Sequence, residues 1–192
     1  MIFDVQPALR LHATGSAVPE NLMQKVWASF GMAQTHTNWG LTEAASIVTV
    51  TKDTDTIPQC RVTSGNLFPG FSAKIVNPTT RNAVARAQRG EIVLRGYGIQ
   101  KCYYGNEKKT AEAHQISPED GLELFHAGDE GYLDANGYFV ITGRIKDMII
   151  RGCENIGPLV IEERLIAHPA VAQCSVIGVP DEKYGEQICA FY

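Results

Sequence analysis

The 192-residue chain carries a formal net charge of −4, and 44% of its residues are hydrophobic. That content is enough for the core of one large or two small soluble globular domains. The acidic balance argues against the basic surface that nucleic acids and anionic membranes require, so we expect no nucleic-acid partner. Since no apolar run is long enough to cross a bilayer, we also expect no transmembrane segment.

The first elements in chain order predict a strand, a helix and a second strand. Residues 8 to 14 alternate as a strand does and run into the turn Gly15-Ser-Ala-Val-Pro19. From Glu20 to Phe30, apolar residues recur at spacings of three and four, which predicts a helix with one buried face. A second strand then leads to the polar segment Asn38-Trp39-Gly40-Leu41-Thr42-Glu43. In an α/β layout, ligands bind at such strand ends.

From about Ser64 to Ile141, short β-rich segments are separated by Gly, Pro and Asn, which is typical of a small antiparallel sheet or barrel. These segments are Ser72–Val76, Glu91–Arg95 and Tyr138–Thr142. We expect Phe125–Gly131 to form a glycine-flanked acidic loop. We expect Asp134-Ala-Asn-Gly137 to form a hairpin turn.

After Arg151 the pattern changes again. It predicts a helix that begins at Pro158 and ends at His168-Pro169, with three residues on its buried side, followed by a strand from Val171 to Val179. The three buried residues are Val160, Ile161 and Leu165. The predicted fold is α/β with a β-barrel-like middle, followed by a small α+β domain. We place the larger domain at 1–145, with an α/β piece at about 8–60 and a β-rich piece at about 64–145, and the smaller domain at 146–192.

Several residues of the segment 38–43 have the chemistry to bind a nucleotide. The face of Trp39 can stack on a base for about 1–3 kcal/mol, and Gly40 lets the backbone approach a ligand. The Thr42 hydroxyl can bond a phosphate oxygen, and the Glu43 carboxylate can hold Mg²⁺ on that phosphate. A plainer interpretation is that Trp39 belongs to the core and that Thr42 and Glu43 are the cap and first-turn acid of a helix.

Two further residues could hold the ribose of a nucleotide. Asp129, between glycines, presents acceptor oxygens for two adjacent hydroxyls, and the planar donor fork of Arg144 can reach ribose or phosphate oxygens. The alternatives are an exposed turn aspartate and a surface arginine that ends a strand.

The order of these motifs resembles the acyl-CoA synthetase branch of the adenylate-forming, AMP-binding superfamily. The resemblance covers about Leu9 to Tyr192. The motifs that carry it are Gly15 with Ala17-Val-Pro19, Trp39-Gly-Leu-Thr-Glu43, Gly128-Asp129, Gly143-Arg-Ile-Lys-Asp147, Gly152-Cys-Glu-Asn-Ile-Gly-Pro158 and Val179-Pro-Asp181. It implies a ligase that activates a carboxylic acid with ATP and Mg²⁺ as acyl-AMP and then transfers the acyl group to CoA. It also implies a place in fatty acid metabolism, although the residues do not choose between fatty and aromatic acids. Luciferases and peptide-synthetase modules are lower-ranked relatives.

The resemblance assigns the nucleotide-binding residues. Trp39 stands where the family usually has a tyrosine over the base, followed by Gly40. Thr42 would contact the α-phosphate and Glu43 the magnesium ion. Three residues would belong to the adenine pocket: Gly15, Ser16 and Ala17.

The resemblance also assigns the ribose and CoA sides of the site. Asp129 and Arg144 would hold the ribose. Lys146 would be the hinge about which the small domain rotates between adenylation and thioester formation. Three residues of the following loop would then face CoA: Gly152, Glu154 and Asn155.

Three local departures from the family pattern are Ala127 for threonine, Cys153 for glycine and Gly157 for an aromatic residue. A side chain at residue 153 occupies a position where glycine permits close approach, so we expect thioester formation to be the weakened step.

The family's phosphate-binding loop and its C-terminal catalytic lysine have no counterpart in the sequence. We therefore expect a partial acid:CoA ligase that is weak or inactive alone, with exposed strand edges that favour self-association. The alternatives are a non-catalytic AMP- or ATP-binding or interaction fragment, and an inert by-product. Five widely spaced cysteines without Cys-x-x-Cys pairs are typical of reduced thiols, which predicts a cytoplasmic protein.

Overall fold

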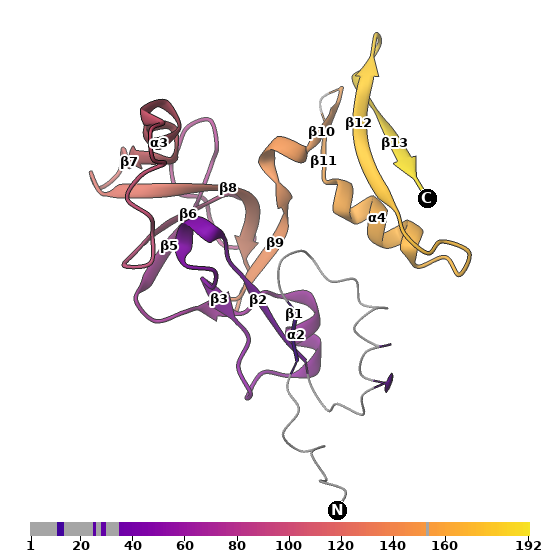
Figure 1. Ribbon diagram of the computed structural model, residues 1–192, viewed down its shortest axis with the longest axis horizontal. Helices are drawn as coiled ribbons and strands as arrows, with labels where there is room; N and C mark the ends of the chain where they lie inside the picture. The colour runs from indigo at the N-terminus through magenta and orange to yellow at the C-terminus, as the bar shows by residue number, and fades with distance from the viewer. Residues whose placement is uncertain (1–10, 14–24, 26–27, 30–34, 153) are drawn as a thin grey trace, which may run out of the picture.

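The computed structural model describes residues 11–13, 25, 28–29, 35–152 and 154–192, which form three sheets that follow one another along the chain (Figure 1). The glycine turn that begins at Gly15 and most of the helix predicted between Glu20 and Phe30 lie outside these residues.

The first sheet has the strand order β1-β2-β3-β4. Its strands are β1 (Leu11–Ala13), β2 (Thr35–Trp39), β3 (Thr49–Val50) and β4 (Asn66–Leu67). β1 and β2 are parallel and the other pairs are antiparallel. A parallel pair of consecutive strands needs a crossover connection, so the predicted α/β layout of this part of the chain is confirmed.

Two short helices belong to this part of the fold. The 3₁₀ helix η2 (Thr42–Ala44) follows β2 directly. The helix α2 (Ile57–Val62) begins with a capping box, in which Thr56 and Gln59 satisfy each other's backbone N–H groups.

The second sheet is antiparallel, with the order β5-β6-β8-β7 and with β9 paired to β8. Its strands are β5 (Phe71–Val76), β6 (Gly90–Gly96), β7 (His114–Ile116), β8 (Glu123–Leu133) and β9 (Phe139–Arg144), and the helix α3 (Glu107–Ala113) precedes β7. This curled sheet confirms the predicted β-barrel-like middle. The hairpin turn is also confirmed, since Gly137 N donates to Asp134 O at 3.1 Å.

The prediction of a loop at Phe125–Gly131 is wrong, because these residues lie inside the 11-residue strand β8. Glycines that normally interrupt a strand are tolerated here because the register of β8 is irregular against two of its three neighbours, β6 and β9. Gly128 has a φ of 71°, so it forms part of a bulge rather than a loop.

The third sheet has the order β11-β10-β13-β12 and lies to one side of the other two (Figure 1). After the 3₁₀ helix η3 (Ile145–Asp147) come β10 (Ile149–Arg151), β11 (Glu154–Ile156), the helix α4 (Pro158–Ile166), β12 (Ser175–Asp181) and β13 (Gly185–Phe191). α4 is anchored to β12, since Val176 N donates to Glu162 Oε1 at 2.8 Å.

The predicted helix does begin at Pro158, but it ends at Ile166, and the next strand begins at Ser175 rather than Val171. The prediction that Val160 is buried is wrong, because its side chain is 57% exposed. The other two residues predicted on the buried side, Ile161 and Leu165, are only half-buried, and no residue of α4 is fully buried.

One core joins the first two sheets. Backbone hydrogen bonds also join the two sheets, between the residues just before β4 and the first residue of β9. Ser64 N donates to Phe139 O at 2.7 Å, and Phe139 N donates to Gly65 O at 2.9 Å. The buried residues of this core are Trp39, Leu41, Ala44, Val48, Ile75, Ile92, Leu94, Phe125 and Phe139. The two sheets therefore pack as one body around the carboxyl end of β2.

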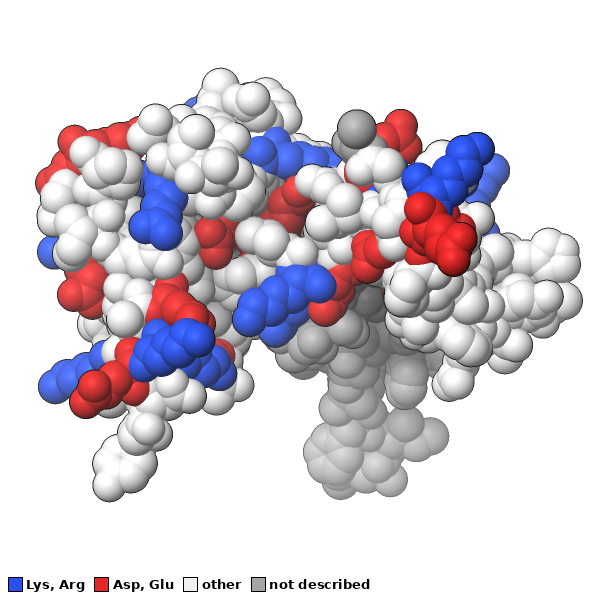
Figure 2. All heavy atoms as spheres, turned by 90° about the horizontal axis from the view of Figure 1, so that it is seen from above, with Lys and Arg blue, Asp and Glu red and all other residues white. Residues whose placement is uncertain are grey.

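On the face drawn in Figure 2, Lys and Arg side chains lie among Asp and Glu side chains. Within the part of the chain that the structure describes, no helix has both the length and the apolar character needed to cross a membrane.

The loop that follows β2 is tightly closed on Gly40. A Cβ atom added at Gly40 would lie 1.9 Å from the carbonyl oxygen of Ser46. Ala45 and Ser46 have φ values of 55° and 77°, in the left-handed region that L-residues avoid. The glycine is thus required by the fold of its own loop.

We expect Gly40→Ala to lower the free energy of unfolding by about 1–3 kcal/mol, because the backbone must move to admit the methyl group. Urea unfolding followed by circular dichroism measures the change. Ala45→Gly is the matched control in the same loop, and we expect it to change stability by less than about 1 kcal/mol, because relief of the left-handed strain offsets the added chain entropy. Equal stability of Gly40→Ala and the parent chain would contradict the prediction.

Candidate functional site

Asp129 lies at the centre of the candidate site. Its side chain is buried, with the residue 5% exposed. Trp39 Nε1 donates a hydrogen bond to Asp129 Oδ2 at 2.9 Å, between residues 90 positions apart in the chain. The two candidate residues, expected on the base and ribose sides of a nucleotide, are therefore in direct contact across two sheets.

Arg144 is the cross-strand partner of Asp129 in the β8–β9 pair. Its Nε lies 3.1 Å from Asp129 Oδ1, and its side chain is 66% exposed. The approach lacks hydrogen-bond geometry, so Oδ1 is buried without a hydrogen-bond partner among the described groups. Because water screens so exposed a partner, the ion pair adds little stability.

Burial raises the pKa of the Asp129 carboxyl, while the Trp39 hydrogen bond and the Arg144 charge oppose that rise. Removing a carboxylate from water disfavours its charged form more than these two donors restore it. The ionised carboxylate is therefore held at a cost in free energy, which a further donor on Oδ1 would reduce.

Glu43 is held by a residue that the sequence patterns did not indicate. Tyr103 Oη donates to Glu43 Oε1 at 2.9 Å, and Gln100 N donates to the Glu43 carbonyl oxygen at 2.8 Å. Burial, then the bond to Glu43, raises the pKa of the Tyr103 phenol, which keeps it a donor. The two residues are 60 positions apart, and no local signal connects them.

Two of the plainer interpretations can be compared with the structure. Trp39 is indeed part of the core, with the residue 9% exposed. Thr42 is not a helix cap, because η2 has Leu41 at its N-cap and no side-chain cap bond. The Thr42 side chain is exposed and therefore accessible to a ligand.

Lys146 is exposed in η3, two positions beyond Arg144. The residues expected to face CoA lie on the third sheet, away from the sheet that carries Asp129. Gly152 occupies the turn between β10 and β11 with a φ of 65°, and its N–H donates to Tyr184 O at 2.8 Å. Glu154 and Asn155 are exposed on β11. The remaining candidates lie outside the described residues: Gly15, Ser16, Ala17 and Cys153.

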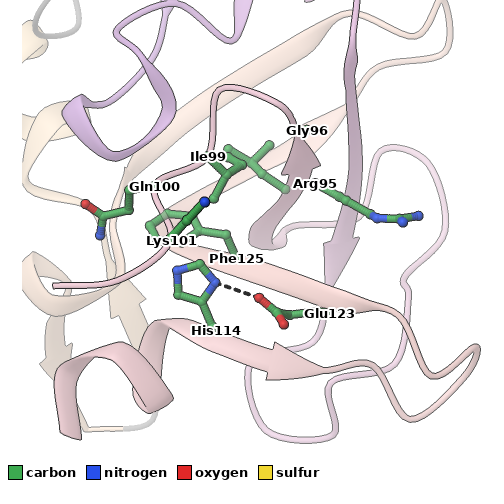
Figure 3. A pocket seen from close by; sticks show the side chains of 9 residues that line it. Arg95, Gly96, Ile99, Gln100, Lys101, His114, Glu123 and Phe125 are labelled. Carbon is green, nitrogen blue, oxygen red and sulfur yellow. Dashed lines mark hydrogen bonds and ion pairs between the residues drawn. The ribbon is translucent and has the colours of Figure 1, made fainter. Parts of the chain in front are cut away.

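A hollow of about 340 Å³ lies at the end of β8 that carries Glu123 (Figure 3). Gln100, which lines it, is the residue whose N–H bonds the Glu43 carbonyl oxygen. The hollow contains a hydrogen-bonded pair, His114 Nδ1 and Glu123 Oε1, 2.9 Å apart. The lining residues are Leu94, Arg95, Gly96, Ile99, Gln100, Lys101, His114, Glu123 and Phe125. The hollow and the Asp129 site draw on different residues.

The residues present fit the magnesium ion that the motif implies. No group of three or more His, Cys, Asp or Glu residues that could hold a metal occurs among the residues described. Mg²⁺ does not need such a group, since it usually takes one or two carboxylates and completes its shell with phosphate oxygens and water. Glu43, half-buried and fixed by Tyr103 through one oxygen, can supply such a carboxylate.

The chain belongs to the AMP-binding enzyme family. Residues 4–104 match the family model described as AMP-binding enzyme. Residues 160–192 match the model of the AMP-binding enzyme C-terminal domain. The resemblance to the adenylate-forming superfamily is thus confirmed.

Similar curated proteins are named acyl-CoA ligases. Acyl-CoA ligase SID4 of Ajellomyces capsulatus is 46% identical over 92% of this chain and 30% of its own length. A medium-chain acyl-CoA ligase, the mitochondrial ACSF2 of Danio rerio, is 36% identical over 98% of this chain and 30% of its own. The chain thus spans about a third of the length of these relatives.

Similar solved structures are adenylate-forming enzymes, which confirms the predicted fold class. ATP-bound MatB from Rhodopseudomonas palustris has a TM-score of 0.82 at 30% identity, over 93% of this chain and 34% of that protein. The o-succinylbenzoate CoA synthetase MenE from Bacillus subtilis, in complex with its acyl-adenylate intermediate, has a TM-score of 0.80 at 27% identity, over 94% of this chain and 35% of that protein.

The raised pKa of Asp129 predicts an unusual dependence of stability on pH. When the folded-state pKa of a carboxyl is raised, the protonated group contributes to the stability of the fold. That contribution is fully present below the ordinary pKa of 3.8 and is lost as the pH rises through the pKa of the folded state. Asp129→Asn removes this titration, so the stability of the parent chain relative to the variant should fall as the pH rises. Urea unfolding at a series of pH values measures the difference.

Asp120→Asn is a control of opposite sign. The hydrogen bond from Lys74 is the main cause that lowers the pKa of Asp120 to about 2. The ionised Asp120 therefore stabilises the fold above pH 3.8, and this stabilisation is lost as the pH falls through about 2. A difference between the parent chain and Asp129→Asn that did not vary with pH would show that Asp129 titrates as an ordinary carboxyl group.

Proposed function

We propose that the chain binds the nucleotide of AMP or ATP with Asp129 as the ribose acceptor, as part of an acid:CoA ligase. The observation that carries this proposal is the buried Oδ1 of Asp129, which has no hydrogen-bond partner among the described groups. Such an atom is costly unless a ligand donor completes it. Arg144 stands beside it as an exposed cation for a ribose or phosphate oxygen.

The proposed reaction has two steps. A carboxylate and ATP give acyl-AMP and pyrophosphate, and acyl-AMP and CoA then give acyl-CoA and AMP. The names of the relatives as acyl-CoA ligases support this reaction. The complete reaction is proposed for a ligase of the relatives' length, and the 192 residues alone are expected to be weak or inactive.

Within this site, we assign Thr42 to the α-phosphate and Glu43 to Mg²⁺, which would neutralise phosphate charge when bound. The exposed hydroxyl of Thr42 lies directly before Glu43 on η2, in the loop that follows β2. Tyr103 orients the Glu43 carboxylate. The base is assigned to the Trp39-Gly40 side, together with the turn Gly15, Ser16 and Ala17.

We assign the rotation between the two steps to Lys146, which divides the chain into domains at 1–145 and 146–192. The support is that η3 is a single 3₁₀ turn between β9 and the third sheet, and so short a link can redirect the third sheet by a few backbone torsions. The rotation would bring the CoA-facing residues Gly152, Glu154 and Asn155 toward the acyl-adenylate.

Isothermal titration calorimetry of the 192-residue chain with AMP tests the proposal. We expect saturable heat for the parent chain. We expect Asp129→Asn and Arg144→Ala to raise the Kd by about tenfold or more, because a hydrogen bond to a charged group contributes about 1.5–3 kcal/mol. Asp129→Asn can keep one acceptor oxygen for Trp39, and it replaces the other oxygen and the charge by an NH₂ donor.

Arg95→Ala is the matched control, since Arg95 is also exposed and lies on the same sheet but lines the separate hollow. We expect it to leave the AMP affinity unchanged. With ATP, Mg²⁺ and CoA, and with octanoate and benzoate as test acids, we expect no pyrophosphate release at the rate of a ligase. No heat with AMP would overturn nucleotide binding, and release at such a rate would overturn the expected weak activity.

We also propose self-association through the outer strand of the third sheet. β12 is an edge strand among the described residues, and its Ile177 is 44% exposed. Exposed apolar edges pair with one another. The weight-average sedimentation coefficient should therefore rise with concentration, and Ile177→Lys should reduce the rise. A coefficient independent of concentration would refute the proposal.

A further inference from the structure

The strand β8 bulges immediately before Asp129. β6 and β8 pair at Val93 with His126 and at Glu91 with Glu130. Between these pairs, Ile92 alone on β6 lies opposite three residues of β8: Ala127, Gly128 and Asp129. A bulge of this kind interrupts the ladder of hydrogen bonds and re-aims the side chains it carries.

A carboxylate from β6 occupies the interrupted part of the ladder. Glu91 Oε2 lies 2.8 Å from His126 Nδ1, and Glu91 Oε1 accepts a hydrogen bond from Gly128 N at 3.3 Å. The side chains of Glu91 and His126 are 13% and 12% exposed. One half-buried carboxylate thus bonds both His126, which precedes the bulge, and the glycine of the bulge.

We propose that Glu91 is a positioning residue, which fixes the bulge of β8 and so aims Asp129 at Trp39 and at the ligand. The role at the ligand rests on the proposed nucleotide binding. Gly128 has a φ of 71°, which fixes the direction of the chain into Asp129. Without Glu91 the half-buried Gly128 N–H would lose its acceptor, and a shielded donor without a partner favours another register.

The inference predicts an ordered set of Glu91 variants. Glu91→Gln keeps an acceptor and the length of the side chain, so we expect an AMP Kd within about threefold of the parent. Glu91→Asp keeps the charge but is one methylene too short to reach both donors. Glu91→Leu removes both acceptors at similar volume. We expect the last two to raise the Kd by about tenfold, the loss of one hydrogen bond to a charged group.

Glu123→Leu is the matched control. Glu123 and His114 form a second Glu–His pair on the same sheet, at the hollow in Figure 3, with a similar separation of 2.9 Å. This pair spans β7 and β8 in regular register. Its loss should leave the AMP affinity unchanged.

The fluorescence of Trp39 reports, in the absence of a ligand, whether the Asp129 side chain stays in position to accept the indole hydrogen bond. The chain has two tryptophans, so Trp27→Phe leaves Trp39 as the only tryptophan, which is excited selectively at wavelengths that tyrosine does not absorb. In that background, Glu91→Asp and Glu91→Leu should shift the emission maximum, because the indole N–H loses its fixed acceptor, whereas Glu91→Gln and Glu123→Leu should not.

Calorimetry with AMP and emission spectra of these variants, each with a circular dichroism spectrum, form the test. If Glu91→Leu does not fold, Glu91→Asp decides. If the parent chain gives no heat with AMP, the proposed function fails and the emission spectra alone decide the inference. The positioning role of Glu91 would be overturned if Glu91→Asp kept the AMP affinity and emission maximum of the parent chain. It would also be overturned if Glu123→Leu changed both as much as the Glu91 variants do.

Discussion

The hydrogen bond from Trp39 to Asp129 is the contact on which the candidate site depends. It joins an α/β sheet to an antiparallel sheet inside a shared apolar core. In that environment a carboxylate retains its charge only if donors surround it, and Trp39 supplies one of them. The fold thus places a costly charge where two sheets meet, and the same placement leaves one carboxylate oxygen without a hydrogen-bond partner among the described groups.

Much of the fold could be predicted from the sequence. Hydrophobic period and turn residues predicted the parallel pair of strands β1 and β2, the antiparallel middle, the hairpin at Asp134–Gly137 and the helix start at Pro158. These features depend on interactions between residues near one another in the chain. The predictions failed at strand β8, where glycines indicated a loop, and at Val160, where the helical period does not say how much of the helix the sheet covers.

The sequence predicted which residues belong to the candidate site, but it did not predict the contacts between them. Motif order selected Trp39, Glu43, Asp129 and Arg144, and the structure pairs Trp39 and Arg144 with Asp129. The order of the motifs could not indicate Tyr103, because its hydrogen bond to Glu43 joins residues 60 positions apart. It could not indicate Glu91 either, because the bulge that Glu91 bonds depends on the register of two strands. The supporting partners are fixed by tertiary packing, which leaves no local pattern.

The continuity of β9 with η3 has a mechanical consequence. Arg144 is both the last residue of β9 and the N-cap of η3, so it touches the buried carboxylate and also begins the turn that leads to the third sheet. Of the three residues that meet at Asp129, Arg144 is the nearest in sequence to that sheet, since only η3 and Met148 separate it from β10. The orientation of the third sheet is therefore linked to the cation beside Asp129 through a connection of four residues.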